Sequence, residues 1–155
     1  ALERTGRLAG FSLTPAGRER HASALEGDSL RARRDELAGW YERFEVVNAT
    51  FKQLCTDWQL VDGERPNDHS DPGYDQAVLG RLGGIHEQAM ELLAEAGHER
   101  LERYAARLAS SAAAVAAGDT RRFTAPLCES YHDVWMELHH DLLTSFGLKR
   151  GAGDA

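Results

Sequence analysis

The chain has 155 residues, of which 42% are hydrophobic and 28% charged, and its net charge is −7. This length can bury one domain-sized core, and the composition is typical of globular proteins. No apolar run reaches the roughly 18 residues of a membrane-spanning helix, and we expect neither a leader peptide nor contact with a membrane. The two cysteines, Cys55 and Cys128, form no CxxC pair, which favours a reduced, cytoplasmic protein.

Charge is unevenly distributed along the chain. Residues 1–34 hold seven arginines against four acids, so the remaining residues carry −10. An acidic body repels phosphate backbones, and residues 35–155 are therefore not expected to read nucleic acid themselves. The basic front portion either lies near DNA or is a solvated arginine face.

The front of the chain predicts a strand followed by a helix. Residues 7–13 are short and loosely alternating, as in a strand. Thr14 is a good N-cap residue and Pro15 suits the first helical position, so a helix is expected to start there. The sequence Gly27-Asp28-Ser29 predicts a break at its end.

Residues 33–60 give the strongest helix prediction. Their large apolar side chains recur three or four residues apart and form one wide face: Leu37, Trp40, Tyr41, Phe44, Val47, Phe51, Leu54 and Trp58. Residues 61–73 are rich in turn formers and predict a loop. Nothing between residues 35 and 150 predicts a strand.

The second half predicts three further helical segments. Asp71-Pro72 repeats the cap-then-proline pattern, and Gly97 suits the C-terminal end of that helix. The next helix covers residues 98–117, and the last is bent or restarted near Pro126 and ends at Gly147. Its expected apolar stripe consists of Leu127, Tyr131, Val134, Leu138, Leu142 and Phe146.

The expected fold is all-α: an antiparallel four-helix bundle, about five helices in all, preceded by a short strand and helix. We expect three parts. Residues 1–32 form the strand and linker helix, residues 33–148 the helical bundle, and residues 149–155 a disordered tail.

The front segment GRLAGFSLTPAGRERHASAL resembles the end of a winged-helix domain of the MarR or PadR type. In those regulators the second wing strand runs into a Leu-Thr-x-x-Gly-Arg helix start, matched by Leu13, Thr14, Gly17 and Arg18. The resemblance implies that the chain, which starts without methionine, is the C-terminal part of a longer transcriptional regulator. DNA would then be bound only through a preceding helix-turn-helix part.

The body resembles a C-terminal helical domain of actinobacterial proteins, in the segments YERFEVVNATFKQLCTDWQL and AGDTRRFTAPLCESYHDVWMELHHDLL. Such segments occur in winged-helix regulators and in chains described as pyruvate phosphate dikinase-like or PEP-utilising. An accessory or docking domain of a phosphotransfer enzyme is therefore the alternative function. The phosphohistidine signature of the PEP-utilising swivelling domain, Thr-Gly-Gly followed by Ser-His, is absent from the sequence.

Four side chains are candidate metal ligands: His86, Cys128, His132 and His139. Imidazole and thiolate bind zinc and similar divalent ions, and a site needs three or four converging groups. However, His132 and His139 would lie about 10 Å apart along a helix. The alternative is that these histidines are hydrogen-bonded at the edge of the core and that no cofactor is bound. A metal-dependent helical sensor is the third candidate function.

The loop around residue 70 concentrates polar groups: Asn67, Asp68, His69, Asp71 and Asp75. Carboxylate and amide oxygens could coordinate a hard cation. The same residue types are also those that turns and N-caps require.

The leading hypothesis is a ligand-sensing and dimerisation domain of a winged-helix regulator. No nucleophile elbow, P-loop or GxGxxG motif is present, so no enzymatic activity is assigned. We expect a homodimer that binds a small-molecule effector among its helices. The candidate ligand-binding residues are Trp58, His69, Tyr74, His86, Tyr131, His132, Trp135 and His139.

Overall fold

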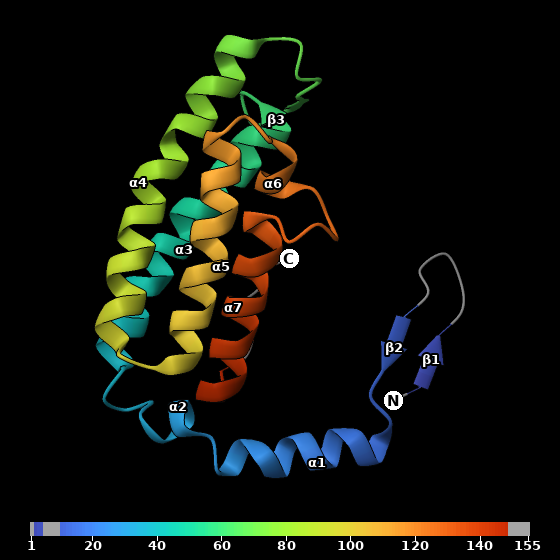
Figure 1. Ribbon diagram of the computed structural model, residues 1–155, viewed down its shortest axis with the longest axis vertical. Coiled ribbons are helices and arrows are strands. Elements are labelled where there is room, and N and C mark those ends of the chain that lie inside the picture. Colours follow the sequence, from blue (N-terminus) through green and yellow to red (C-terminus); the bar gives the residue numbers. More distant parts are fainter. Residues whose placement is uncertain (1, 5–9, 149–155) are drawn as a thin grey trace. The chain divides into compact units, whose positions relative to one another are not determined.

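The computed structural model describes residues 2–4 and 10–148. Within them the chain is mostly helical, with seven helices and two small antiparallel sheets of two strands each (Figure 1). The expected helical class is therefore confirmed, and the predicted tail at 149–155 lies outside the described residues. The chain divides into two compact units: Ala1–Glu36 with Leu143–Ala155, and Leu37–Leu142.

The first unit opens with a β-hairpin. Strand β1 (Leu2–Arg4) pairs antiparallel with β2 (Gly10–Ser12), and Glu3 lies opposite Phe11. The strand predicted over residues 7–13 is confirmed at β2, while residues 7–9 lie outside the described part. Strand β1 was not predicted, because three residues are too few to show alternation.

Helix α1 (Pro15–Glu26) starts where the sequence predicts. The Oγ1 atom of Thr14 accepts a hydrogen bond from the backbone N–H of Gly17 at 3.0 Å, and Pro15 is the first helical residue. None of the α1 residues is buried within the chain. After the predicted break, Asp28 caps the short helix α2 (Ser29–Ala32).

Helix α3 (Ala38–Gln59) begins later than the predicted start at residue 33. Its apolar face begins only at Leu37, and residues 34–36 are exposed, so no burial holds them in helical form. The predicted face is otherwise confirmed, with Tyr41 only half-buried. Its fully buried members are Trp40, Phe44, Val47, Phe51, Leu54 and Trp58.

A second hairpin follows α3, in a region where no strand was predicted. Strand β3 (Leu60–Val61) pairs with β4 (Arg65–Pro66). The turn between them contains Asp62 and Gly63, both with positive φ angles, of 57° and 74°. Asp-Gly is a recognised hairpin signal, but strands of two residues are too short to show alternation within a run of turn formers.

Helices α4 (Pro72–Ala96) and α5 (Glu99–Ala116) have the predicted extents and pack against each other, and α4 also packs against α3. Asp71 caps α4 as predicted, accepting hydrogen bonds from the N–H groups of Gly73 and Tyr74. Gly97 ends the helix in the left-handed conformation, with φ of 54°. Tyr74 of α4 and Tyr104 of α5 are half-buried.

Gly97→Ala is expected to lower the free energy of unfolding by about 1 kcal/mol, because an L-residue is strained at this φ. Gly84→Ala is expected to raise it by about 0.5–1 kcal/mol. An added Cβ at residue 84 meets nothing within 4 Å, and alanine favours a helix interior. Urea unfolding followed by circular dichroism measures both; changes of the same sign would contradict this reasoning.

The last predicted helix is divided in two. Helix α6 (Arg121–Thr124) ends before Pro126, and α7 (Tyr131–Phe146) begins after Ser130, whose Oγ accepts the N–H of Asp133. Placing Leu127 in the apolar stripe was wrong: it is 90% exposed, with φ of 60°. Cys128 also lies outside the helix, because the backbone leaves helical form at Pro126. The remaining predicted stripe is buried.

Two side chains hold the connection between α6 and α7. Arg122 Nη1 donates to the carbonyl oxygen of Cys128 at 2.8 Å, and Ser111 Oγ donates to that of Glu129 at 2.7 Å. These bonds satisfy two backbone carbonyls in a segment that is not helical and in which Glu129 has a positive φ.

None of the described helices combines the length and apolar character needed to cross a membrane.

Candidate ligand-binding site

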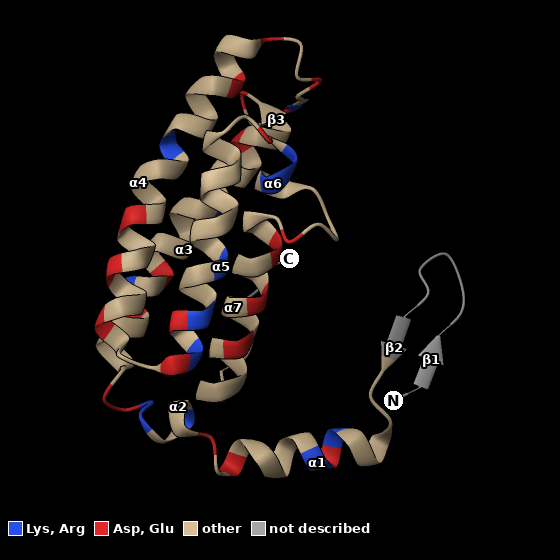
Figure 2. Cartoon of the chain, in the orientation of Figure 1, with Lys and Arg blue, Asp and Glu red and all other residues tan. Residues whose placement is uncertain are grey.

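A groove of about 770 Å³ lies between α4 and α5, within the usual size range for small-molecule sites. Charged residues occur along both helices (Figure 2). None of them lines the groove. Its polar lining residues are Gln76, His86 and Thr120. The remainder of the lining is aliphatic or glycine: Leu79, Gly80, Leu82, Gly83, Ala109, Ala112, Ala113, Val115, Ala116 and Gly118.

The groove exists because both helices carry small residues over this part of their length. A Cβ added at Gly80 or Gly83 would meet nothing within 4 Å. Farther along the same helices, buried leucines such as Leu93 and Leu108 fill the interior. Leucine side chains therefore fill the space between the two helices at one end. Where α4 carries glycine and α5 carries alanine, the space stays open.

His86 connects the groove to the buried interior. Its Nδ1 lies 3.3 Å from the hydroxyl oxygen of Tyr131, and the two rings meet edge to face at 5.8 Å. Tyr131 is fully buried, and desolvation raises the pKa of its hydroxyl. Desolvation also lowers the pKa of His86, against a smaller opposing effect of Glu87. Both groups are therefore held in their neutral forms.

Behind Tyr131 lies a cluster of buried rings. Trp135 contacts the ring of Phe51 at 4.8 Å and stacks on those of Phe44 and Tyr131 at 5.4 and 6.0 Å. Its Nε1–H donates to Asn48 Oδ1 at 2.9 Å, so the indole is satisfied inside the core. Trp135 is fully buried and does not line the groove. Its predicted role in ligand contact is therefore replaced by a role in packing.

The two predicted histidines of α7 lie elsewhere. His132 lines a separate surface depression along α7, and its ring lies 6.5 Å from that of Phe51. Burial lowers its pKa, with Asp133 acting in the opposite direction. His139 is 1% exposed, and its Nε2 lies 3.3 Å from Glu45 Oε1. Both were expected at the edge of the core, whereas His139 lies inside it.

The lowered pKa values of His86 and His132 predict acid destabilisation. Both rings ionise near pH 6.5 when unfolded and at lower pH when folded, so the unfolded state binds more protons between these values. The stability that they contribute is complete above about pH 6.5 and is lost as the pH falls through the folded values. Urea unfolding between about pH 7 and pH 5 measures it. A His86→Gln, His132→Gln double variant with an unchanged pH slope would contradict this assignment.

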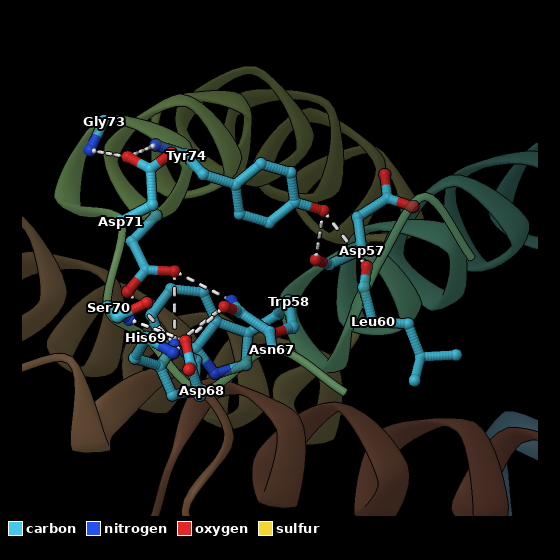
Figure 3. Close-up of polar contacts among 11 residues, drawn as sticks. Asp57, Trp58, Leu60, Asn67, Asp68, His69, Ser70, Asp71, Gly73 and Tyr74 are labelled. Carbon is cyan, nitrogen blue, oxygen red and sulfur yellow. Dashed lines mark hydrogen bonds and ion pairs between the residues drawn. The ribbon is translucent and has the colours of Figure 1, made fainter. Parts of the chain in front are cut away.

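A second polar cluster, the end cluster, joins the end of α3 to the loop before α4 (Figure 3). Asn67 Nδ2 donates to the carbonyl oxygen of Trp58 at 3.1 Å and to Asp75 Oδ1 at 2.9 Å. His69 Nδ1 lies 3.0 Å from Asp75 Oδ2, and its ring lies 4.5 Å from that of Trp58. His69 has a φ of 57°, and its N–H donates to Asn67 Oδ1.

Tyr74 and Asp57 complete the end cluster. The Tyr74 hydroxyl lies 2.7 Å from the carbonyl oxygen of Asp57 and 3.1 Å from that of Leu60, at the C-terminal end of α3. The Asp57 carboxylate pairs with Arg81 of α4. These bonds close the end of α3 against α4.

The hydrogen bonds favour capping over cation binding in this loop. Asp71 caps α4, and Asp68 Oδ1 accepts the N–H of Ser70 at 3.0 Å. Bonding to Ser70 lowers the pKa of Asp68. Over residues 2–4 and 10–148, no three His, Cys, Asp or Glu side chains are arranged to hold a metal ion.

The four candidate metal ligands therefore do not converge. His86 bonds Tyr131, and Cys128 Sγ lies 3.2 Å from the carbonyl oxygen of Ala125. His132 and His139 lie in the separate surroundings described above. Helical periodicity grouped only Cys128, His132 and His139, whereas α7 begins after Cys128 and its two histidines face different neighbours.

The eight predicted ligand-binding residues fall into separate places. Trp58, His69 and Tyr74 belong to the end cluster, and only His86 lines the α4–α5 groove. The other four, all on α7, are core or depression residues. The small residues that shape the groove were missed. The available signal was three glycines within five residues, Gly80, Gly83 and Gly84, in an otherwise good helix.

No protein-family description, curated protein or solved structure matched this chain in the comparisons.

Proposed function

We propose that this chain is the ligand-sensing and dimerisation part of a winged-helix transcriptional regulator. The observation that carries the proposal is a set of hydrogen bonds among the four residues of the winged-helix resemblance, Leu13, Thr14, Gly17 and Arg18. Thr14 Oγ1 accepts the N–H of Gly17, and Arg18 Nη1 donates to the carbonyl oxygen of Leu13 at 2.9 Å. The hydrogen bonds of these four residues thus hold the connection between strand β2 and helix α1, which corresponds to the end of a wing in the proposed fold.

The glycine of this motif has a local reason. A Cβ at Gly17 would lie 3.2 Å from Thr14 Oγ1, so a side chain there would crowd the cap. Strand β2 ends at Ser12 and α1 begins at Pro15, which leaves only the capping segment between them. A strand that passes directly into a capped helix is the local structure that the resemblance implies, and it supports the proposal.

The helices provide the sensing part of the proposal. We take α3, α4, α5 and α7 as an antiparallel four-helix bundle whose α4–α5 groove holds the effector. Dimerisation would use α1, because none of its residues is buried within the chain and its apolar side chains could pack against a second copy. A ligand that changes the spacing of α4 and α5 would then alter the spacing of two DNA-binding heads.

The test uses the polypeptide encoded by the complete gene, together with the present chain. Light scattering should give twice the monomer mass for the present chain, and the complete polypeptide should bind DNA from its own promoter with strong salt dependence. An upstream helix-turn-helix would agree with this result. A monomer, or an upstream ATP-grasp or swivelling domain without DNA binding, would overturn the proposal and favour a phosphotransfer enzyme.

A further inference from the structure

We infer that the α4–α5 groove binds a neutral, largely apolar small molecule whose hydrogen-bond acceptor pairs with the Nε2–H of His86. The inference deepens the proposed function by naming the chemical class of effector. Three observations carry it: the size and lining of the groove, the hydrogen bond between His86 and Tyr131, and glycines that the fold does not require.

Size and charge define the class of ligand. A groove of about 770 Å³ can hold a molecule of drug-like size. Its walls are mainly aliphatic, and no Lys, Arg, Asp or Glu contributes to the lining. An ionised ligand would lose water there without gaining a countercharge. An uncharged, mainly apolar molecule matches this lining.

The Tyr131–His86 bond determines which ring nitrogen can donate to a ligand. Tyr131 is fully buried, so its hydroxyl proton needs an acceptor inside the protein. His86 Nδ1, 3.3 Å away, provides that acceptor. In a neutral imidazole the proton must then be on Nε2, which becomes a donor. His86 lines the groove, so a carbonyl or ether oxygen of the ligand is the matching group.

The glycines form the third observation. Gly80 and Gly83 have no positive φ that would require glycine, and no neighbour lies within 4 Å of an added Cβ. Glycine inside a helix is less favourable than alanine by about 1 kcal/mol. The fold therefore gives up stability at these positions with no packing gain, which is a common feature of functional sites. The open volume is what these residues provide.

The test measures binding of Nile red, a neutral planar dye with a carbonyl acceptor, to the 155-residue chain. Saturable fluorescence enhancement at one dye per chain is expected. Gly83→Leu should weaken binding at least about tenfold by filling the groove. Gly84→Leu is the matched control: residue 84 is equally open but faces the depression between α3 and α4. It should change affinity less than about twofold.

Two further comparisons test the chemistry. His86→Leu should weaken Nile red binding about fivefold, as expected for one lost hydrogen bond, and His86→Gln should restore it through its amide N–H. The anionic dye 1-anilinonaphthalene-8-sulfonate should bind at least about tenfold more weakly than Nile red. The melting temperature of each variant is measured as well, so that weaker dye binding can be distinguished from loss of the folded structure.

Absence of saturable binding, equal losses in the two glycine variants, or preference for the anionic dye would each overturn the inference. These results are independent of the regulator proposal. Failure of Nile red binding in a protein whose complete form binds DNA would refute only the ligand class and site. Confirmed groove binding without DNA binding would refute only the regulator.

Discussion

Trp135→Ala is expected to lower the free energy of unfolding by about 3–5 kcal/mol, the largest effect that we predict for a single substitution. Trp135 is completely buried, with an exposed fraction of 0%. Its indole ring contacts the rings of Phe44 on α3 and Tyr131 on α7. Truncation removes these contacts and leaves a cavity in a core that cannot collapse around several rigid rings. Urea unfolding of the purified variant measures the loss.

Part of this loss belongs to Asn48, which is 2% exposed and accepts the Trp135 Nε1–H. Trp135→Phe preserves most of the ring volume but removes the donor, so a cost of about 1–2 kcal/mol is expected from the unpaired amide oxygen. A double-mutant cycle with Asn48→Ala isolates the pair. Val46→Ala is the matched surface control, since Val46 is 67% exposed; its effect should stay within about 0.5 kcal/mol. A similar effect for Val46 and Trp135 would contradict the assignment of the core.

Asn67→Ala is expected to lower the free energy of unfolding by about 2 kcal/mol, because one side chain joins three parts of the end cluster. Its amide donates to the carbonyl oxygen of Trp58 and to Asp75, and its Oδ1 accepts the N–H of His69. Alanine removes all three bonds and leaves a positive φ at His69 without its side-chain support. Thermal and urea unfolding both measure the change.

Asp68→Ala is the matched control for Asn67→Ala. It is the adjacent residue, it is exposed, and its carboxylate accepts the N–H of Ser70. Its loss should cost less than about 1 kcal/mol, because water can replace an exposed partner. Equal losses in the two variants would mean that Asn67 acts as an ordinary turn residue and does not connect the end of α3 to α4.

The core and the groove differ in how fully side chains fill the space between helices. Phe44, Phe51 and Trp135 fill the interior between α3 and α7 with rigid rings, whereas glycine and alanine leave α4 and α5 partly unfilled. His86 lies between them, with Nδ1 toward Tyr131 and its ring at the groove. His86 is thus the residue of the groove lining that contacts the buried ring of Tyr131.

The sequence by itself determined most helix positions, because the signals are local. Thr14 and Asp71 cap α1 and α4, Gly97 ends α4, and the three- and four-residue spacing of α3 identifies its buried face. Local signals also explain two errors that were avoidable. Asp62-Gly63 marks the β3–β4 turn, and Ser130 marks the true start of α7.

Only the tertiary structure decided which side chains meet. Helical spacing indicates that residues share a face but not what that face contacts, so it grouped Cys128, His132 and His139, to which His86 was added as a candidate ligand from another helix. In the folded chain, the helix is interrupted at Pro126, so Cys128 lies outside α7. The Nδ1 of His86 is hydrogen-bonded to the Tyr131 hydroxyl. The groove likewise depends on the pairing of α4 with α5. Small residues leave a hollow only where the facing helix also lacks large side chains, and no single segment of sequence contains that information.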